Sequence, residues 1–203
     1  MKNAKKFKRR SLPARVLDVG SKPTDSVGLL RVADRREDTY ACLSHYWGKP
    51  KKGDTPITLA IQSEASLKQG VPIDKFPMNY QDAIRFYRLL GIRYLWIEAL
   101  CIIQDSAEDW TCESLEMASY YRYRTICLAA TRSPDRDGGS RPIKTRVEYQ
   151  LPGVGGPRGR ILVTEKPLGV PHFWLAKNFP YDEYYPLLTR AWMYQERRLS
   201  PRL

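Results

Sequence analysis

A run of twelve residues, from Ile92 to Ile103, limits the fold of this chain more than any other segment. Its sequence is Ile-Arg-Tyr-Leu-Trp-Ile-Glu-Ala-Leu-Cys-Ile-Ile, and only Arg93 and Glu98 carry a charge. A strand covered by helices on both faces shows such a run, because neither face meets water. The run therefore predicts a central parallel strand in an α/β sheet.

The segments around this run alternate between the strand and helix patterns. Apolar residues recur at helical spacing in two segments, and shorter apolar runs that end at glycine or polar residues indicate strands. The predicted order is strand 40–48, helix 79–90 capped by Asn79, strand 92–103, helix 107–121 capped by Ser106, and strand 125–130. Because this is β–α–β–α–β order with right-handed crossovers, we expect a doubly wound, flavodoxin-like parallel sheet with flanking helices.

The length of 203 residues fits one domain. Residues 1–13 are expected to form a basic flexible arm and residues 14–203 the domain, which starts with short strands in 14–34. A long irregular insertion is predicted over 133–159, where Pro, Gly and Arg are frequent. One more strand over 161–164 and a last helix over 189–199 complete the prediction.

The net charge of +12 is unevenly distributed. Residues 1–10 carry six basic side chains and no acidic one, whereas 11–131 carry fifteen of each sign. A neutral domain with a basic arm argues against nucleic-acid binding. With two histidines and four scattered cysteines we predict no metal, and no apolar run reaches the roughly 20 residues that cross a bilayer. A cytoplasmic protein without membrane contact is expected.

Three sequence blocks carry a family resemblance. They are Tyr40-Ala-Cys-Leu-Ser-His-Tyr-Trp-Gly48, the segment 91–105 with the following Asp109-Trp-Thr-Cys-Glu113 and Met117, and Arg190-Ala-Trp-Met-Tyr-Gln-Glu-Arg-Arg-Leu-Ser-Pro-Arg202. In order and spacing these blocks resemble the motifs of the fungal heterokaryon-incompatibility (HET) domain. The chain departs from that pattern at Glu98, where the family usually has Asp, and at Ala191, where it usually has Gly.

The resemblance implies an effector of nonself recognition and programmed cell death, which is a form of innate immunity. HET domains are similar to TIR domains, many of which cleave NAD at the nicotinamide–ribose bond. A TIR-like NADase would need no cofactor, since NAD is its substrate, and would be expected to form homo-oligomers on activation. The alternative implied by the same resemblance is a non-catalytic adaptor that oligomerises and recruits partner proteins of the nonself-recognition system.

Glu113 is the candidate catalytic residue, because TIR enzymes place a glutamate in the helix after a central strand. At about 100° per residue, Glu113 falls in the apolar arc of its helix with Met117 and Tyr121. A carboxylate in that position is poorly solvated, which raises its pKa and is common at functional sites. The alternative is a structural carboxylate paired with an arginine such as Arg122 or Arg124.

The candidate ligand-binding residues are expected at the carboxyl end of the sheet, where α/β folds bind ligands. Glu98 interrupts an apolar strand and so must be paired or lie at its carboxyl end, in a ligand-binding or structural role. The neighbouring strand ends in Ser44, His45, Tyr46 and Trp47, which offer hydroxyl groups and aromatic faces for NAD. The alternative for these aromatic residues is ordinary core packing.

Overall fold

The computed structural model describes residues 10–33, 36–49, 57–131, 133–139, 147–150, 160–163 and 187. The chain divides into two compact units, Met1–Ser140 with Tyr181–Leu203, and Arg141–Pro180. In the second unit, β8 (Val147–Gln150) pairs antiparallel with β9 (Arg160–Val163), so the strand predicted over 161–164 is present one residue earlier. The segment 133–159, predicted to be irregular, contains the strand β8, which its Pro and Gly content did not indicate. The helix predicted over 189–199 lies outside the described residues.

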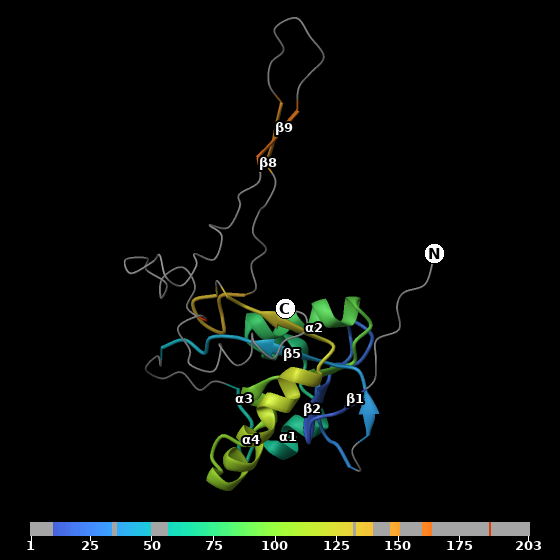
Figure 1. The fold of residues 1–203 in the computed structure, drawn as a ribbon, viewed down its shortest axis with the longest axis vertical. Helices are drawn as coiled ribbons and strands as arrows, with labels where there is room; N and C mark the ends of the chain where they lie inside the picture. Colours follow the sequence, from blue (N-terminus) through green and yellow to red (C-terminus); the bar gives the residue numbers. More distant parts are fainter. Residues whose placement is uncertain are drawn as a thin grey trace, which may run out of the picture. The chain divides into compact units, whose positions relative to one another are not determined.

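The first unit is built on a five-stranded mixed sheet (Figure 1). From one edge to the other its strands are β3 (Gly28–Arg31), β2 (Arg15–Asp18), β6 (Tyr94–Trp96), β5 (Tyr40–Ser44) and β7 (Ile126–Ala129). Strand β5 runs parallel to both β6 and β7, whereas β2 runs antiparallel to β6 and β3. The α/β prediction is confirmed, and the sheet is mixed because the short strands of 14–34 join it as an antiparallel pair.

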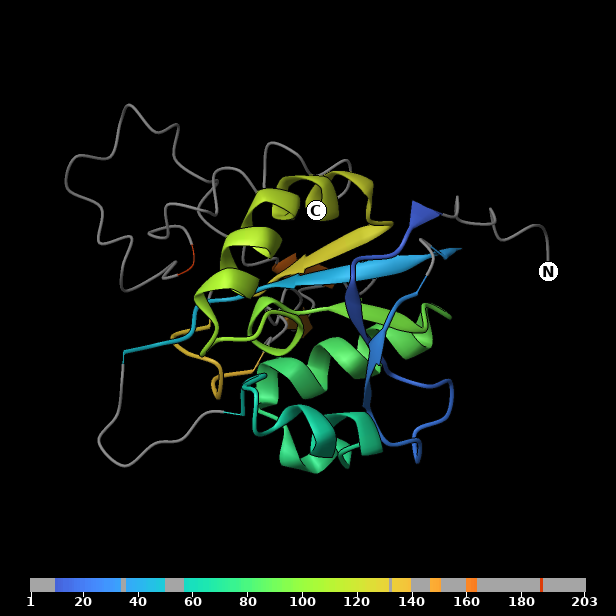
Figure 2. The same cartoon turned by 90° about the horizontal axis from the view of Figure 1, so that it is seen from below.

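Helices cover both faces of this sheet. The helical elements are α1 (Glu64–Gln69), the 3₁₀ turn η1 (Ile73–Lys75), α2 (Met78–Leu89), α3 (Glu98–Cys101) and α4 (Ala107–Tyr123). Figure 2 shows α4, in yellow-green, on one face and α1 and α2, in green, on the other. The chain therefore crosses from β5 to β6 through α2 on one face, and from β6 to β7 through α4 on the opposite face. The parallel strands are doubly wound, as the β–α–β–α–β order predicts.

Two local predictions need correction. The apolar run 92–103 is not one strand, because β6 ends at Trp96 and α3 begins two residues later. Both pieces are buried, and burial on all sides produces the same apolar pattern in a strand and in a short helix. Asn79 does not cap α2, which begins at Met78 after Pro77. Ser106, in contrast, caps α4 as predicted, since its hydroxyl accepts the Asp109 N–H at 3.2 Å.

The fold includes part of the segment that the sequence assigned to the basic arm. Strand β1 (Arg10–Ser11) pairs antiparallel with β4 (Glu37–Asp38), and the Leu12 N–H donates to the Arg36 carbonyl at 3.0 Å. The Leu12 side chain is only 6% exposed and belongs to the core. Residues 10–12 are therefore part of the domain, and residues 1–9 of the predicted arm lie outside the described residues.

One tyrosine of α2 reaches into the hydrogen-bonding pattern of the sheet. The Tyr87 hydroxyl donates to the Cys42 carbonyl of β5 at 2.7 Å and accepts the Leu128 N–H of β7 at 2.6 Å. Since Cys42 lies opposite Cys127 in the register, these two backbone groups are the ones that a parallel ladder would join directly. The hydroxyl therefore ties α2 to the boundary between β5 and β7. Among the described residues, no helix is long and apolar enough to cross a membrane.

Candidate functional site

The topology of the sheet marks the boundary between β5 and β7 as its ligand-binding position. From β5 the chain passes to β6 on one side and then crosses to β7 on the other side, so the strand order reverses beside β5. In doubly wound folds ligands bind at the carboxyl edge of the sheet at such a reversal. The loops that follow these two strands are residues 45–49 after β5 and residues 130, 131 and 133–139 after β7.

The last residue of β5 and the loop after it include four of the predicted ligand-binding residues. Ser44 ends β5 and is buried, and its carbonyl accepts the Ala130 N–H at 2.9 Å. The buried His45 ring lies with Nε2 2.9 Å from the Tyr80 hydroxyl of α2. Its plane is within 8° of that of the Trp47 ring, with ring centres 6.3 Å apart. Tyr46 and Trp47 are half-buried. The structure thus brings these residues to the predicted edge.

Asn79 connects the loop after β7 to the start of α2. Its Nδ2 donates to Ser133 Oγ at 3.0 Å and to the Asp135 carbonyl at 2.8 Å, and its backbone N–H donates to the Arg136 carbonyl at 3.0 Å. Sequence reasoning missed this residue because asparagine at a helix start ordinarily caps the helix. Full burial of its side chain distinguishes the two roles, and no local pattern in the sequence reveals it.

The two loops pack closely against each other at Gly48. This residue has a φ of +85°, and a Cβ there would lie 2.5 Å from Asp135 Cβ. Only glycine combines that backbone conformation with so close an approach. The loops after β5 and β7 are therefore fitted together beyond the carboxyl ends of the two strands.

Two buried polar atoms at this edge lack hydrogen-bond partners in the described part of the chain. They are the acceptor Oδ1 of Asn79 and the donor Nε1 of Trp47. Nearly all buried polar groups in folded proteins are satisfied, so each exception needs an explanation, such as strain, a functional role or a bound water. Among the described residues, the loop after β5 therefore contains an unused donor and the start of α2 an unused acceptor.

Glu98 lies where β6 meets α3. It is the first residue of α3 and is half-buried, and its carbonyl accepts the Ile102 N–H at 3.1 Å and Gln104 Nε2 at 3.2 Å. Of the alternatives that the sequence leaves open for Glu98, a position beyond the carboxyl end of its strand is the one that the structure shows. Its use as a ligand-binding residue remains a prediction.

Glu113 lies in a buried cluster on the α4 face of the sheet. It is 7% exposed, its Oε2 accepts a hydrogen bond from the Tyr120 hydroxyl at 2.9 Å, and its Oε1 lies 3.4 Å from Arg15 Nη2. The same Nη2 donates to Asp109 Oδ2. The sequence correctly places Glu113 toward the core, but its ion-pair partner is Arg15 rather than the arginines considered from helix geometry.

Arg15 holds three elements of the domain together. Its guanidinium is buried, and Nε donates to the Cys101 carbonyl at the end of α3 at 2.6 Å. Asp109 Oδ2 also accepts the Ile103 N–H at 2.8 Å. One cation from β2 thus organises the end of α3 and the start of α4 around Glu113.

Burial is the largest single influence on the pKa values of Glu113 and Arg15. It raises the pKa of Glu113 above the ordinary 4.5, while the Tyr120 hydrogen bond and the Arg15 charge act in the opposite direction and only partly offset it. Burial alone would lower the pKa of Arg15, but the hydrogen bond to Asp109 and the two neighbouring carboxylates raise it overall. Arg15 therefore stays charged, and Glu113 is a carboxyl group that the fold makes easier to protonate.

This shift predicts how stability changes with pH. The folded state holds the Glu113 proton more tightly than the unfolded state does, so wild type should lose stability relative to Glu113→Gln as pH rises from 4.5 through the raised folded pKa. Denaturant unfolding of both proteins, from about pH 4 to about pH 8, measures the difference. If wild type instead gains stability relative to the variant over this range, the ion pair with Arg15 affects the pKa of Glu113 more than burial does.

The candidate residues therefore form two groups. His45 and Trp47 lie in the loop after β5, and His45 contacts α2 on one side of the sheet. Glu113 belongs to α4, which covers the other side, and contacts β2 through Arg15. Among the described residues, no group of three His, Cys, Asp or Glu side chains is arranged to hold a metal ion. The chemistry that these groups offer is electrostatic and hydrogen-bonding.

Comparison with known proteins places the chain in a family. The model of the family described as "Heterokaryon incompatibility protein (HET)" matches residues 40–196, which is well over half of the chain. That span begins at the first residue of β5 and includes both groups of candidate residues. Neither the curated proteins nor the solved structures gave a match. The chain belongs to the heterokaryon incompatibility (HET) protein family.

Proposed function

We propose that this protein performs the role in heterokaryon incompatibility and cell death implied by its family by binding NAD and cleaving the nicotinamide–ribose bond. The observation that carries the proposal is that His45 and Trp47 lie in the loop after β5, at the carboxyl edge where the strand order reverses. Aromatic rings at this position provide faces for a nucleobase or a nicotinamide ring.

The unused donor and acceptor at this edge suit the carboxamide of nicotinamide. A carboxamide offers an oxygen that accepts and an NH₂ group that donates, which complements Trp47 Nε1 and Asn79 Oδ1. Both atoms are buried, and Ser133 and Asp135 hold the Asn79 side chain, so a ligand would reach Asn79 only after residues 133–139 shift. Binding is therefore proposed to open the contact between this loop and α2.

Glu113 is proposed to stabilise the transition state. When the C–N bond breaks, neutral nicotinamide leaves with the bonding electrons and the ribose acquires oxocarbenium character. A water oxygen then bonds to C1′ and releases a proton, which gives ADP-ribose. The proposal requires the bound NAD to extend across the carboxyl edge, from Asn79 and Trp47 on the α2 side to Glu113 on the α4 side. A carboxylate near the ribose would then favour the developing positive charge, as in glycoside cleavage. Arg15 and Tyr120 would act as positioning residues, because they hold both Glu113 oxygens.

The direct test is nicotinamide release by the purified full chain. The protein is incubated with NAD, alone and fused to a tetramerising coiled coil, and the products are separated chromatographically. Release of nicotinamide together with ADP-ribose is expected. NADH is the matched control, since its dihydropyridine is not a cationic leaving group and should stay intact. If nicotinamide is not released even by the tetrameric form, the enzymatic proposal fails.

The second candidate function is a non-catalytic adaptor, and one observation favours it. Both carboxylate oxygens of Glu113 are already engaged inside the domain. In addition, the end of α2 exposes Phe86, Leu89 and Leu90, with Leu89 86% exposed. Clustered exposed apolar side chains commonly mark protein contacts. Assembly without NAD cleavage in the experiment above would support the adaptor.

A further inference from the structure

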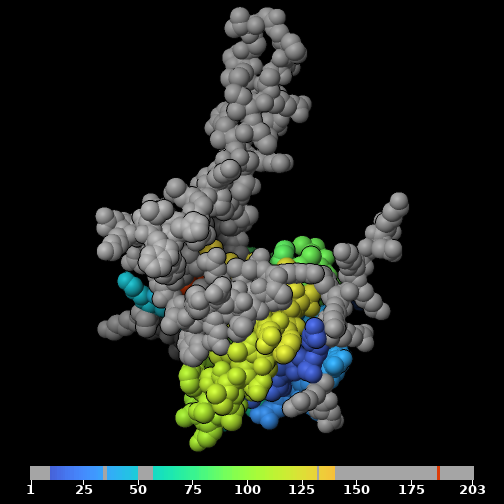
Figure 3. Space-filling view, in the orientation of Figure 1, coloured from blue at the N-terminus to red at the C-terminus, as the bar shows by residue number. Residues whose placement is uncertain are grey.

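A cavity separate from the carboxyl edge lies between α4 and the N-terminal strands. It has a volume of about 740 Å³ and lies among β1, β4, the first residue of β5 and the second half of α4. Figure 3 shows the surface of α4, in yellow-green, adjoining that of the N-terminal strands, in blue. Because Tyr40 begins β5, the cavity is at the opposite edge of the parallel strands from His45. Its size is within the range of small-molecule sites.

The inner wall of the cavity is apolar and fixed. The buried Tyr40 and Tyr120 both line it, and each hydroxyl is already hydrogen-bonded, Tyr40 to the Tyr120 carbonyl at 2.7 Å and Tyr120 to Glu113. Leu12 and Val32 add aliphatic surface. Tyrosines whose hydroxyls are committed present rigid ring surface, which suits a hydrocarbon or a cation over a ring.

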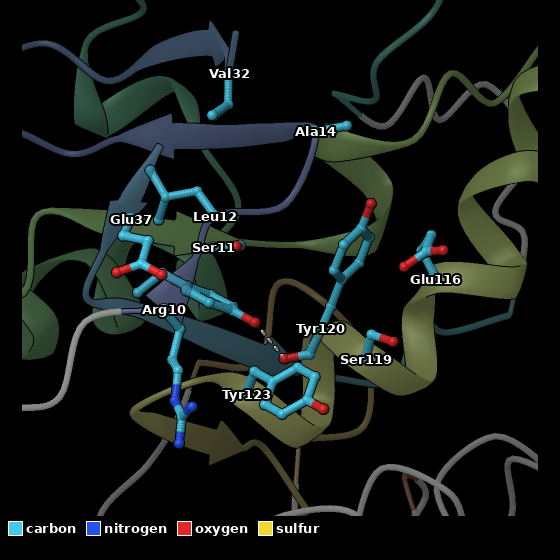
Figure 4. A pocket seen from close by; sticks show the side chains of 11 residues that line it. Arg10, Ser11, Leu12, Ala14, Val32, Glu37, Glu116, Ser119, Tyr120 and Tyr123 are labelled. Atoms are coloured by element: carbon cyan, nitrogen blue, oxygen red, sulfur yellow. Dashed lines mark hydrogen bonds between the residues drawn. The ribbon is translucent and has the colours of Figure 1, made fainter. Parts of the chain in front are cut away.

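The rim of the cavity carries two carboxylates on opposite sides. Glu37 comes from β4 and Glu116 from α4, and Figure 4 shows them on opposite sides of the tyrosine wall. Both side chains are exposed, and in the described part of the chain neither carboxylate accepts a hydrogen bond or forms an ion pair. Arg10 is the one cation among the lining residues, and its guanidinium lies 5.6 Å from the centre of the Tyr123 ring. Arg122 lies 5.8 Å from the same ring.

We propose that this cavity binds a small aliphatic diamine or polyamine. Each terminal ammonium would pair with one rim carboxylate, and the methylene chain would lie on the wall formed by Tyr40, Tyr120 and Leu12. The lining has two acidic side chains and one basic side chain, which disfavours anions such as phosphates. Two separated anions with apolar surface between them match a ligand with two separated cations and hydrocarbon between them.

The experiment compares hexane-1,6-diamine with hexane-1,6-diol, which has the same chain length and no charge. Binding to the purified full chain is followed by calorimetry and by ligand-observed NMR at low salt. Saturable one-to-one binding of the diamine is expected, with an affinity on the order of tenfold above that of the diol. Spermidine should bind at the same site and displace the diamine.

Substitutions locate the site. Glu37→Gln and Glu116→Gln should each weaken diamine binding about threefold to fivefold, and the double variant on the order of tenfold. Arg10→Ala should strengthen it severalfold, because a charge of the same sign as the ligand is removed from the lining. Asp74→Asn is the matched control, since Asp74 is an exposed carboxylate on η1 and does not line the cavity.

Several results would overturn this proposal. One is equal affinity for the diamine and the diol, and another is the absence of saturable diamine binding. A third is a loss of diamine affinity in Asp74→Asn as large as the loss in the Glu37 and Glu116 variants. Thermal unfolding of each variant establishes that the comparison uses folded protein. Since NAD is absent from these measurements, their outcome is independent of the proposed NAD cleavage.

Discussion

Replacing Arg15 with Met is expected to lower the free energy of unfolding by about 3–5 kcal/mol. The change keeps much of the aliphatic stem but leaves Asp109 and Glu113 without their shared cation and the Cys101 carbonyl without its Arg15 donor. Removing one member of a buried ion cluster is costly because the remaining charges stay in a medium that solvates them poorly. Urea unfolding monitored by circular dichroism measures the loss.

Arg31→Met is the matched control, because Arg31 lies opposite Arg15 in the β2–β3 register. The Arg31 side chain is exposed and pairs with Glu64, so the substitution should lower the free energy of unfolding by less than about 1 kcal/mol. Similar losses for the two substitutions would show that Arg15 contributes no more than a surface ion pair.

Replacing Glu113 with Gln is expected to reduce nicotinamide release on the order of 10²–10³-fold, the usual effect of removing one electrostatic stabiliser of a transition state. Glutamine keeps the shape of the side chain and an acceptor for the Tyr120 hydroxyl. Because burial raises the pKa of Glu113, the folded state does not favour the ionised form, and stability at neutral pH should not fall. Turnover and thermal unfolding are measured on the same preparation.

Glu108→Gln is the control on the same helix, since Glu108 is an exposed carboxylate in the first turn of α4. Its turnover should equal that of wild type. Undiminished release by the Glu113 variant would remove Glu113 from the mechanism and leave it a structural partner of Arg15. Equal losses in both variants would indicate a general effect of charge on α4.

The parts of the fold that follow from local pattern could be predicted from the sequence. Apolar runs located the parallel strands, and Ser106 with the following periodicity located α4. The division of 92–103 into β6 and α3 could not be predicted, because both elements are buried on all sides and periodicity disappears in such positions. The antiparallel addition of β2 to β6 depends on pairing across more than seventy residues, for which a single sequence holds no signal.

The candidate site shows the same division between local and distant information. Helical spacing was sufficient to predict that Glu113 faces the core. Its partner Arg15 is almost a hundred residues earlier, so the nearby arginines of α4 were the natural but wrong candidates. Likewise Asn79 satisfies a local rule for helix caps, while its actual contacts, Ser133 and Asp135, lie more than fifty residues away.

Three contacts made by α2 have a shared mechanical consequence. Tyr80 holds His45 of one loop, Asn79 holds the other loop, and Tyr87 bridges β5 and β7 with its hydroxyl. Because all three contacts are on one rigid helix, a displacement at one of them also displaces the other two. Motion of the loop after β7 is therefore coupled to loosening of the strand boundary beneath it. Amide hydrogens of Leu128, Ser133 and residues 135–139 should consequently exchange with solvent in one concerted opening event.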